Sequence, residues 1–492
     1  MRRCIFKIFF LAILAVSCSQ PEMLTPVRVV TELDIGKSKE ITLRNGEKVT
    51  LLLERVEIFR DSLREAIRDV NVTLEVNGEK AILHSGNYNL PVEVGGVQVD
   101  CPVVKAYYEN SNEDRWGLTH DARFRIWPAG SPYMSPGTFI YPVKQAWFAG
   151  MTQSGNEPPY VDWGENLSSR NIYYHSGHDF GGAEGMDEIV SAMDGVVISA
   201  LGDTLEGYYD FPGDIRPDVV WVRSDLGWFI RYSHLDSTDP DIRAGTRVKK
   251  GQTIGLMGKQ GGSGGWVHLH FELKTRETAS GAWGTEEAYP YLWEAYVKQY
   301  QPAVIAVARP HHLVWTGQPV LLDGSKSRSI SGSIVSYEWT FTDGSTARGA
   351  IQERTYGEPG EYSEILKVVD EKGNVDYDFA VVQVYDKNLP GQTIPVMQPA
   401  YYPSLNIRPG DPVTFLVRTF NTETGSEIWD FGDGSPEVQT KSEPPDRQHY
   451  TEGEFAKTVH AYSEPGDYIV SVERPDSLGQ LARAHLHVLV VQ

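Results

Sequence analysis

Short runs in which apolar and polar residues alternate recur along most of this 492-residue chain, and turn-forming residues separate them. Near the start, the runs Glu40–Leu43 and Val49–Leu53 flank the pair Asn45-Gly46, and a second Asn-Gly pair follows at Asn77. A period of two residues is typical of strands with one buried face, and Asn-Gly is a favoured hairpin turn. We therefore predict a small β domain over residues 27–126. The sequence leaves open whether this domain is structural or covers a site elsewhere.

A second group of strand-like runs predicts an antiparallel β core over residues 141–275, inside a domain of residues 127–301. These runs begin at Ile189, Gly195, Val219, Trp228, Gln252 and His268. The stretch 127–163 is rich in Pro, Gly and aromatic residues, so we expect an irregular loop that leads into this core. An apolar helical segment, Tyr291–Val297, closes the domain before Pro302.

The remainder of the chain divides into two repeats, residues 302–388 and 389–492. Each contains a Trp, an Asp-Gly turn and a later Tyr-x-x-Pro-Gly-x-Tyr corner, over Trp339–Tyr362 and Trp429–Tyr468. Both repeats resemble the PKD domain, which implies an Ig-like β-sandwich whose core is filled by the Trp. We expect a structural role for His460, which lies within the second motif. The fold class expected for the whole chain is mainly β.

Residues 1–17 have the features of an export signal: basic residues precede an apolar run that is too short to span a bilayer. Cys18 follows small residues and resembles the lipobox of bacterial lipoproteins, which implies that it is lipidated and that residues 18–26 are a linker. Several acyl chains would then anchor the protein to a membrane. Because Ser19 replaces the Asp that retains such lipoproteins in the inner membrane, we expect an exported envelope protein of the outer membrane. An ordinary secretory signal, cut elsewhere, is the alternative.

Net charge and cysteine content exclude a class of partner and a class of fold. The formal net charge is −21 at pH 7, and loss of Arg2, Arg3 and Lys7 with the signal changes it to −24 (−21 − 3). This charge repels nucleic acid backbones, so no nucleic-acid partner is expected. One of the three cysteines lies in the signal and Cys18 is the lipidation candidate, so no disulfide framework is available. We expect Cys101 to be a half-buried strand residue.

Histidines with short, regular spacing indicate the chemistry of the second domain. They lie in three pieces: His175-Ser-Gly-His-Asp179, Tyr232-Ser-His234-Leu and His268-Leu-His270-Phe-Glu. His and Asp side chains supply the nitrogen and oxygen ligands of a catalytic zinc ion that keeps one position open. His268 and His270 are two residues apart on a predicted strand, so both point to one face while Leu269 points into the core. One of the two histidines is then available to bind metal and the other to move protons.

The three pieces resemble the motifs of the lysostaphin/LytM family of zinc metallopeptidases (peptidase family M23), and the match covers about Tyr141–Leu273. Two intervening segments, Asp194–Val197 and Gly245–Gly255, follow the family pattern in the same order. The resemblance implies one Zn2+ per chain with three ligands: His175, Asp179 and His270. It also implies that His234 and His268 are catalytic and lie beside the metal. We expect His268 to be the general base and His234 to stabilise the oxyanion or to assist proton transfer.

Glycines precede the last histidine motif and predict a loop that approaches its neighbours closely, with the substrate backbone as one candidate. They are Gly261, Gly262, Gly264 and Gly265. The residues that follow, Trp266 and Val267, depart from the family pattern, which leaves the contacts at the edge of the cleft open. The insertion Gly202–Pro217 is either a solvated loop or a wall of the substrate site. His178, His311 and His312 are expected to be structural.

The function implied by the resemblance is a zinc metalloendopeptidase of the cell envelope. Its substrate would be the stem or cross-bridge peptides of peptidoglycan, and the PKD domains would contact a protein or glycan partner. Two alternatives stay open: a peptidase that acts on proteins, and an inactive peptidase-fold binding protein such as an adhesin or amidase activator. The presence of every candidate zinc ligand argues against the inactive protein.

Overall fold

Antiparallel sheets make up most of the structure, as the alternating sequence pattern predicts. A computed structural model describes residues 25–492 except 87, 110–114, 148–171, 173, 209, 390, 392, 445–448 and 450. The expected signal peptide and Cys18 lie outside the described residues. Within them the helices are α1 (Ala106–Glu109) and α3 (Tyr289–Tyr300). Neither of these two helices is long and apolar enough to cross a membrane.

The N-terminal domain consists of two four-stranded sheets, in the orders β1-β8-β7-β6 and β2-β3-β4-β5. Its strands are β1 (Val29–Leu33), β2 (Ser38–Thr42), β3 (Lys48–Arg60), β4 (Ile67–Val76), β5 (Glu79–His84), β6 (Val92–Val94), β7 (Val97–Val104) and β8 (Ala122–Pro128). The predicted turn at Asn45-Gly46 joins β2 to β3, and Gly46 has the positive φ of 87° that such a turn requires. Cys101 on β7 is 1% exposed, so the expectation of a half-buried residue is wrong. Strand β7 lies between β8 and β6 and is covered on both of its faces, so Cys101 is buried whichever face it occupies.

The central domain is built on an eight-stranded sheet with the order β12-β11-β13-β14-β18-β19, to which β16 is added beside β11 and β9 beside β18. Strand β18 pairs with β14, β19 and β9, and a separate three-stranded sheet has the order β10-β17-β15. The strands are β9 (His178–Gly181), β10 (Glu188–Val190), β11 (Gly195–Ala200), β12 (Asp203–Thr204), β13 (Val220–Ser224), β14 (Phe229–Ser233), β15 (Leu235–Thr238), β16 (Arg247–Val248), β17 (Thr253–Met257), β18 (His268–Thr275) and β19 (Gly284–Glu286). Each of the six predicted runs overlaps one of these strands.

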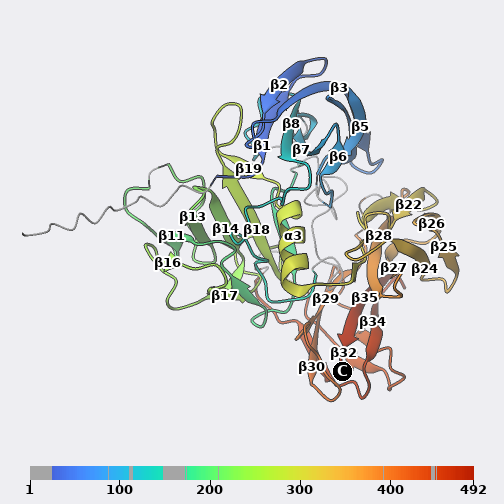
Figure 1. Ribbon diagram of the computed structural model, residues 1–492. Coiled ribbons are helices and arrows are strands. Elements are labelled where there is room, and N and C mark those ends of the chain that lie inside the picture. The colour runs from blue at the N-terminus through green and yellow to red at the C-terminus, as the bar shows by residue number, and fades with distance from the viewer. Residues whose placement is uncertain are drawn as a thin grey trace, which may run out of the picture.

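Helix α3 stands beside β18, with the N-terminal domain at one end and the C-terminal domains at the other (Figure 1). It ends where Gln301 adopts a left-handed φ of 48°, directly before Pro302. The described part of the stretch before the core, residues 129–147, is irregular as predicted. Its backbone is tied to α3, because the amides of Tyr133 and Met134 both donate to the Glu294 carboxylate at 3.1 Å.

The last two domains are sandwiches of antiparallel sheets, with one parallel pair between β21 and β28. The first contains β20 (Val304–Ile305), β21 (His312–Trp315), β22 (Pro319–Asp323), β23 (Arg328–Ser329), β24 (Ile334–Thr340), β25 (Thr346–Arg348), β26 (Ile351–Thr355), β27 (Gly360–Asp370) and β28 (Val375–Tyr385). The second contains β29 (Val396–Tyr402), β30 (Val413–Phe420), β31 (Glu427–Asp430), β32 (Val438–Thr440), β33 (Ala456–His460), β34 (Gly466–Pro475) and β35 (Leu481–Val490). Trp339 and Trp429 are fully buried in the two cores. His460 stacks on Phe431 and contacts Asp433 at 2.7 Å, a packing arrangement that agrees with its expected structural role.

Buried charges join the N-terminal domain to the central domain. Arg28 Nε and Arg125 Nη1 donate to the same Glu286 oxygen, at 2.7 and 2.8 Å, and Arg125 Nη2 donates to Asp100 at 2.5 Å. Burial alone would raise the pKa of Glu286, but the two guanidinium groups lower it to about 2. Since removal of one member would leave an uncompensated charge in the interior, this network fixes the two domains to each other.

Asp187, directly before β10, makes the stability of the central domain depend on pH. Its side chain is buried, Oδ2 accepts a hydrogen bond from the Ala183 amide at 2.7 Å, and Oδ1 has no partner among the described residues. Burial raises the pKa from 3.8 to about 7. Between about pH 4 and pH 7 the unfolded chain therefore loses a proton that the folded chain keeps, so stability falls by up to about 4 kcal/mol as pH rises through this window.

We expect Asp187→Asn to remove the fall in stability with rising pH, because the amide stays neutral at every pH and can still accept a hydrogen bond from the Ala183 amide. The melting temperature of the variant should exceed that of the natural protein at pH 8 and approach it at pH 4. Thermal unfolding at both pH values measures the effect, and Asp203→Asn, at an exposed position of β12, is the control. Parallel pH profiles for the natural protein and Asp187→Asn would contradict the prediction.

Candidate active site

Strands β9 and β18 bring the candidate ligands together. The two strands are antiparallel, and Asp179 lies directly opposite His270 in their register. Side chains of directly opposed residues point to the same face of a sheet. His268 points to this face as well, since its Nε2 is 3.5 Å from Asp179 Oδ2, while Leu269 is fully buried in the core. The predicted division of this strand into a site face and a core face is therefore confirmed.

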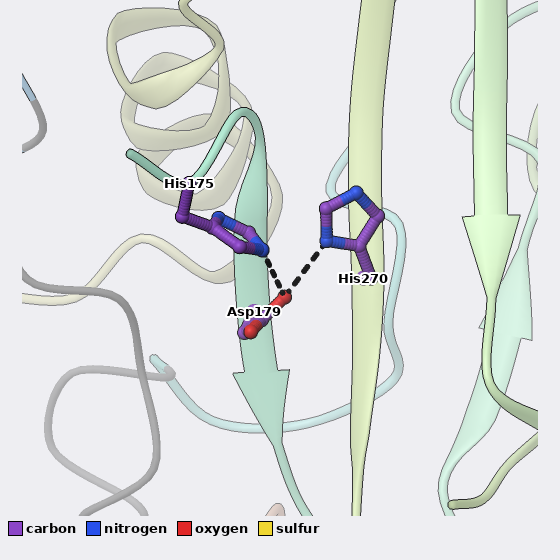
Figure 2. Close-up of side chains that lie close together, drawn as sticks. All are labelled: His175, Asp179 and His270. Atoms are coloured by element: carbon purple, nitrogen blue, oxygen red, sulfur yellow. Dashed lines mark hydrogen bonds and ion pairs between the residues drawn. The ribbon is translucent and has the colours of Figure 1, made fainter. Parts of the chain in front are cut away.

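Asp179 is the centre of the cluster that Figure 2 shows. Its Oδ1 lies 3.5 Å from His175 Nε2 and 3.0 Å from His270 Nδ1. One ligand atom from each of these three residues lies within 4.8 Å of the other two. Two imidazoles and a carboxylate form a donor set that suits zinc with one position left open. The three residues predicted as ligands thus fit a zinc ion.

Gly177 allows His175 to reach this cluster from the segment before β9. Its φ is +101°, and a Cβ atom there would lie 2.7 Å from the Phe271 carbonyl oxygen and 3.3 Å from the His270 ring. Both the backbone conformation and the space exclude a larger residue. The glycine of the His-x-Gly-x-Asp motif is therefore a requirement of the site's geometry.

His234 and His268, the two predicted catalytic residues, lie next to each other beside the ligands. Their ring centroids are 4.7 Å apart, and the His234 ring is 6.2 Å from that of His270. His234 has a φ of 66°, which a residue with a side chain rarely adopts, at the junction between β14 and β15. Its Nδ1 is 2.7 Å from the Gln260 carbonyl oxygen, and His268 Nδ1 is 3.1 Å from the Trp266 carbonyl oxygen.

Burial sets the protonation states of the cluster. It lowers the pKa of His175 to about 3, and it lowers those of His234 and His270 as well. For Asp179 burial acts in the opposite direction, but His175 and His268 outweigh it and hold the pKa well below its usual value. Neutral imidazoles beside an ionised carboxylate are the forms that bind a metal cation.

Glu272 is a buried carboxylate close to the ligand His270, at a position that the sequence did not single out. The residue is two positions beyond His270 on β18, is 1% exposed, and places Oε2 4.0 Å from His270 Nε2. Ser176 and Thr285 donate to its Oε1 at 2.9 and 2.6 Å, and Lys274 Nζ lies 2.8 Å from the same atom. A separation of 4.0 Å is too long for a hydrogen bond, so Glu272 acts on His270 through its negative charge, which favours the protonated imidazole. The two-residue period of the strand was the signal that could have identified it.

The other histidines lie outside the cluster. His178 is 2% exposed and contacts Glu287 at 2.5 Å, and His311 Nδ1 accepts from the Val381 amide at 3.2 Å. His312 begins β21 in the first sandwich. These positions agree with the structural roles expected for them.

The insertion 202–217 combines packing with a position beside the site. Phe211 packs on Trp221 and Phe229, with ring centroids 5.2 and 5.5 Å away. At its end, Arg216 Nε donates to Asp218 at 3.0 Å, and Asp218 lies 3.8 Å from His234. The insertion is therefore more than a solvated loop.

Comparison with known proteins identifies three domains of the chain. A model described as peptidase family M23 matches residues 173–281, and PKD domain models match residues 301–384 and 400–490. A microbial collagenase of Vibrio alginolyticus is 29% identical over 107 residues, which cover 20% of this chain and 13% of the collagenase. Collagenase ColA of Clostridium perfringens is 29% identical over 312 residues, which cover 57% of this chain and 27% of ColA. This chain thus spans well under half the length of either curated relative.

Among solved structures, a putative glycyl-glycine endopeptidase lytM of Ruminococcus gnavus is similar at 22% identity with a TM-score of 0.22. The match covers 32% of this chain and 60% of that one. The M23 match includes all five residues predicted for the site, from His175 to His270. The chain therefore contains a peptidase family M23 domain followed by two PKD domains.

Proposed function

We propose that this protein is a zinc-dependent metalloendopeptidase of the cell envelope that hydrolyses peptide bonds in peptidoglycan. The observation that carries the proposal is the convergence of five side chains within an M23 domain: His175, Asp179, His234, His268 and His270. A single convergent cluster of histidines and one carboxylate is the arrangement expected of a metal-assisted hydrolase.

His175, Asp179 and His270 would hold one zinc ion. When bound, zinc supplies a Lewis acid that polarises the carbonyl of the scissile bond. The Asp179 carboxylate would compensate part of the positive charge of the ion. The ligands thus leave His234 and His268 to transfer protons.

His268 is the candidate general base. A backbone carbonyl can only accept a hydrogen bond, so the contact with Trp266 places the proton of neutral His268 on Nδ1 and leaves Nε2 as the acceptor. Nε2 lies 3.5 Å from Asp179, on the ligand side of the ring. A base in this position can take a proton from an attacking water molecule.

His234 has the same tautomer for the same reason, since its Nδ1 donates to the Gln260 carbonyl. Neutral His234 therefore has no hydrogen on Nε2 with which to stabilise an oxyanion. Of the two roles expected for this residue, assistance in proton transfer is the one that its hydrogen bonding favours.

The proposal also includes a substrate and a cellular location. An export signal with a lipidated Cys18 would anchor the enzyme in the envelope, in the outer membrane, within reach of stem and cross-bridge peptides. The PKD domains would contact a protein or glycan partner. A protein substrate is the second candidate, since two of the similar proteins are named collagenases.

The test is to purify the protein with zinc, measure metal by mass spectrometry, and offer sacculi, gelatin and casein as separate substrates. We expect about one zinc per chain, release of new amino termini from sacculi, loss of activity with a chelator and recovery with added zinc. Cleavage of the proteins alone would favour the second candidate. Stoichiometric zinc without turnover on any of the three substrates would instead indicate an inactive binding protein.

A further inference from the structure

The loop that precedes the last histidine motif is attached to the second PKD domain. The Val267 amide donates to Gln398 Oε1 at 2.8 Å, and Gln398 Nε2 donates to the Val267 carbonyl at 2.6 Å. Gln398 lies on β29 and is fully buried. One side chain of the second PKD domain thus pairs with both polar backbone groups of the residue that precedes His268.

Two further contacts hold the same loop. The Trp266 indole is stacked on the ring of Phe420, with centroids 4.2 Å apart and planes 8° from parallel. Arg418 Nη1 donates to the Gly265 carbonyl at 3.4 Å. The glycine-rich loop expected to be a candidate path for the substrate backbone therefore packs, at residues 265–267, against the protein's own C-terminal domain.

The apolar cluster around Trp266 includes residues from all four domains. Besides Trp266, it contains Leu63, Leu313, Trp315, Tyr385, Ile394, Val396 and Phe420. Leu63 comes from the N-terminal domain, and Trp315 Nε1 of the first PKD domain donates to the Ser62 carbonyl beside it at 3.3 Å. The loop is thus held at a junction of the whole chain rather than by the peptidase domain alone.

The same loop supplies the carbonyls that set the tautomers of the proposed catalytic histidines. His234 contacts Gln260 and His268 contacts Trp266, at the two ends of the segment. A shift of this segment would move both acceptors, and a displacement of about 1 Å at a catalytic group can lower a rate by about a hundredfold. The ligand His270 is held differently, because its Nδ1 contacts Asp179 on β9 rather than a carbonyl of this loop.

We propose that the second PKD domain is a working part of the active site and that Gln398 is a positioning residue. Through the Val267 backbone, Gln398 holds the loop of residues 260–267, which in turn orients His234 and His268. The inference deepens the proposed function, on which its kinetic part rests.

The test compares Gln398→Met, which keeps the size of the side chain and removes both hydrogen bonds, with Gln439→Met. Gln439 is an exposed residue of β32 in the same domain, so its replacement controls for a change of composition there. We expect Gln398→Met to lower kcat by about tenfold to a hundredfold with KM within about threefold, and to keep one zinc per chain. Gln439→Met should have the kcat, the KM and the zinc content of the natural protein.

Hydrogen exchange of the zinc-loaded protein without substrate is the second measurement. Peptides that contain Val267 should exchange at least about tenfold faster in Gln398→Met than in Gln439→Met, because the Val267 amide loses its acceptor. Phe420→Leu, which removes the stack on Trp266, should lower kcat with KM and zinc content kept, and it serves if Gln398→Met fails to fold.

Unchanged kcat together with unchanged exchange would overturn the inference, and so would a fall in activity explained by loss of zinc. A change confined to KM would overturn it too, since the loop would then contact substrate rather than position histidines. If the natural protein hydrolyses nothing, the proposed function fails, whereas the exchange experiment still decides whether Gln398 holds the loop.

Discussion

Replacement of His270 by alanine is expected to abolish both zinc binding and hydrolysis. His270 Nδ1 and His175 Nε2 converge on Asp179, and the variant would leave a site of one imidazole and one carboxylate. A structural or catalytic zinc site requires at least three protein ligands. Since the Lewis acid contributes several kcal/mol to the transition state, its loss should lower activity by roughly a thousandfold or more.

Metal content by mass spectrometry and release of amino termini from the substrate measure the two effects on one sample. His84→Ala is the matched control, because His84 on β5 has a half-exposed side chain and contacts Asp69 rather than any site residue. The control should keep about one zinc per chain and full activity. Stoichiometric zinc in His270→Ala would show that the ligand assignment is wrong.

The site residues could be predicted because they lie in short motifs that resemble those of a known family, and local patterns agree with their placement. The two-residue period of β18 separates His268 and His270 from Leu269, and the structure follows it. Gly177 has the positive φ that its motif requires. In the same way, Trp339 and Trp429 fill the cores expected from the two C-terminal repeats. Local alternation and turn chemistry determined these features, so a single sequence contains them.

Contacts between domains could not be predicted, because no spacing in the chain records them. Gln398 and Val267 are 131 residues apart, and Arg28 and Glu286 are 258 apart. Each pair is formed when separately folded surfaces meet. The loop of residues 260–267 shows the consequence: Trp266 and Val267 contact a PKD domain. Of its glycines, Gly261 lies close to Arg216 in the peptidase domain, and Gly262 has open space around it.

Replacement of His268 by alanine is expected to lower kcat by about a hundredfold to ten-thousandfold, the range found when a general base is removed, while about one zinc per chain remains. The variant leaves the three ligand side chains, and the contact between His270 and Asp179, unchanged. The variant therefore differs from His270→Ala in one measurable respect: His268→Ala loses activity but keeps its zinc, whereas His270→Ala loses both.

His234→Ala, measured in parallel, shows how proton transfer is divided between the two histidines. A larger loss of kcat in His234→Ala than in His268→Ala would reverse the roles proposed for them. Activity within about threefold of the natural protein in both variants would mean that neither imidazole moves a proton in the rate-limiting step, and a base would have to be sought elsewhere in the cleft.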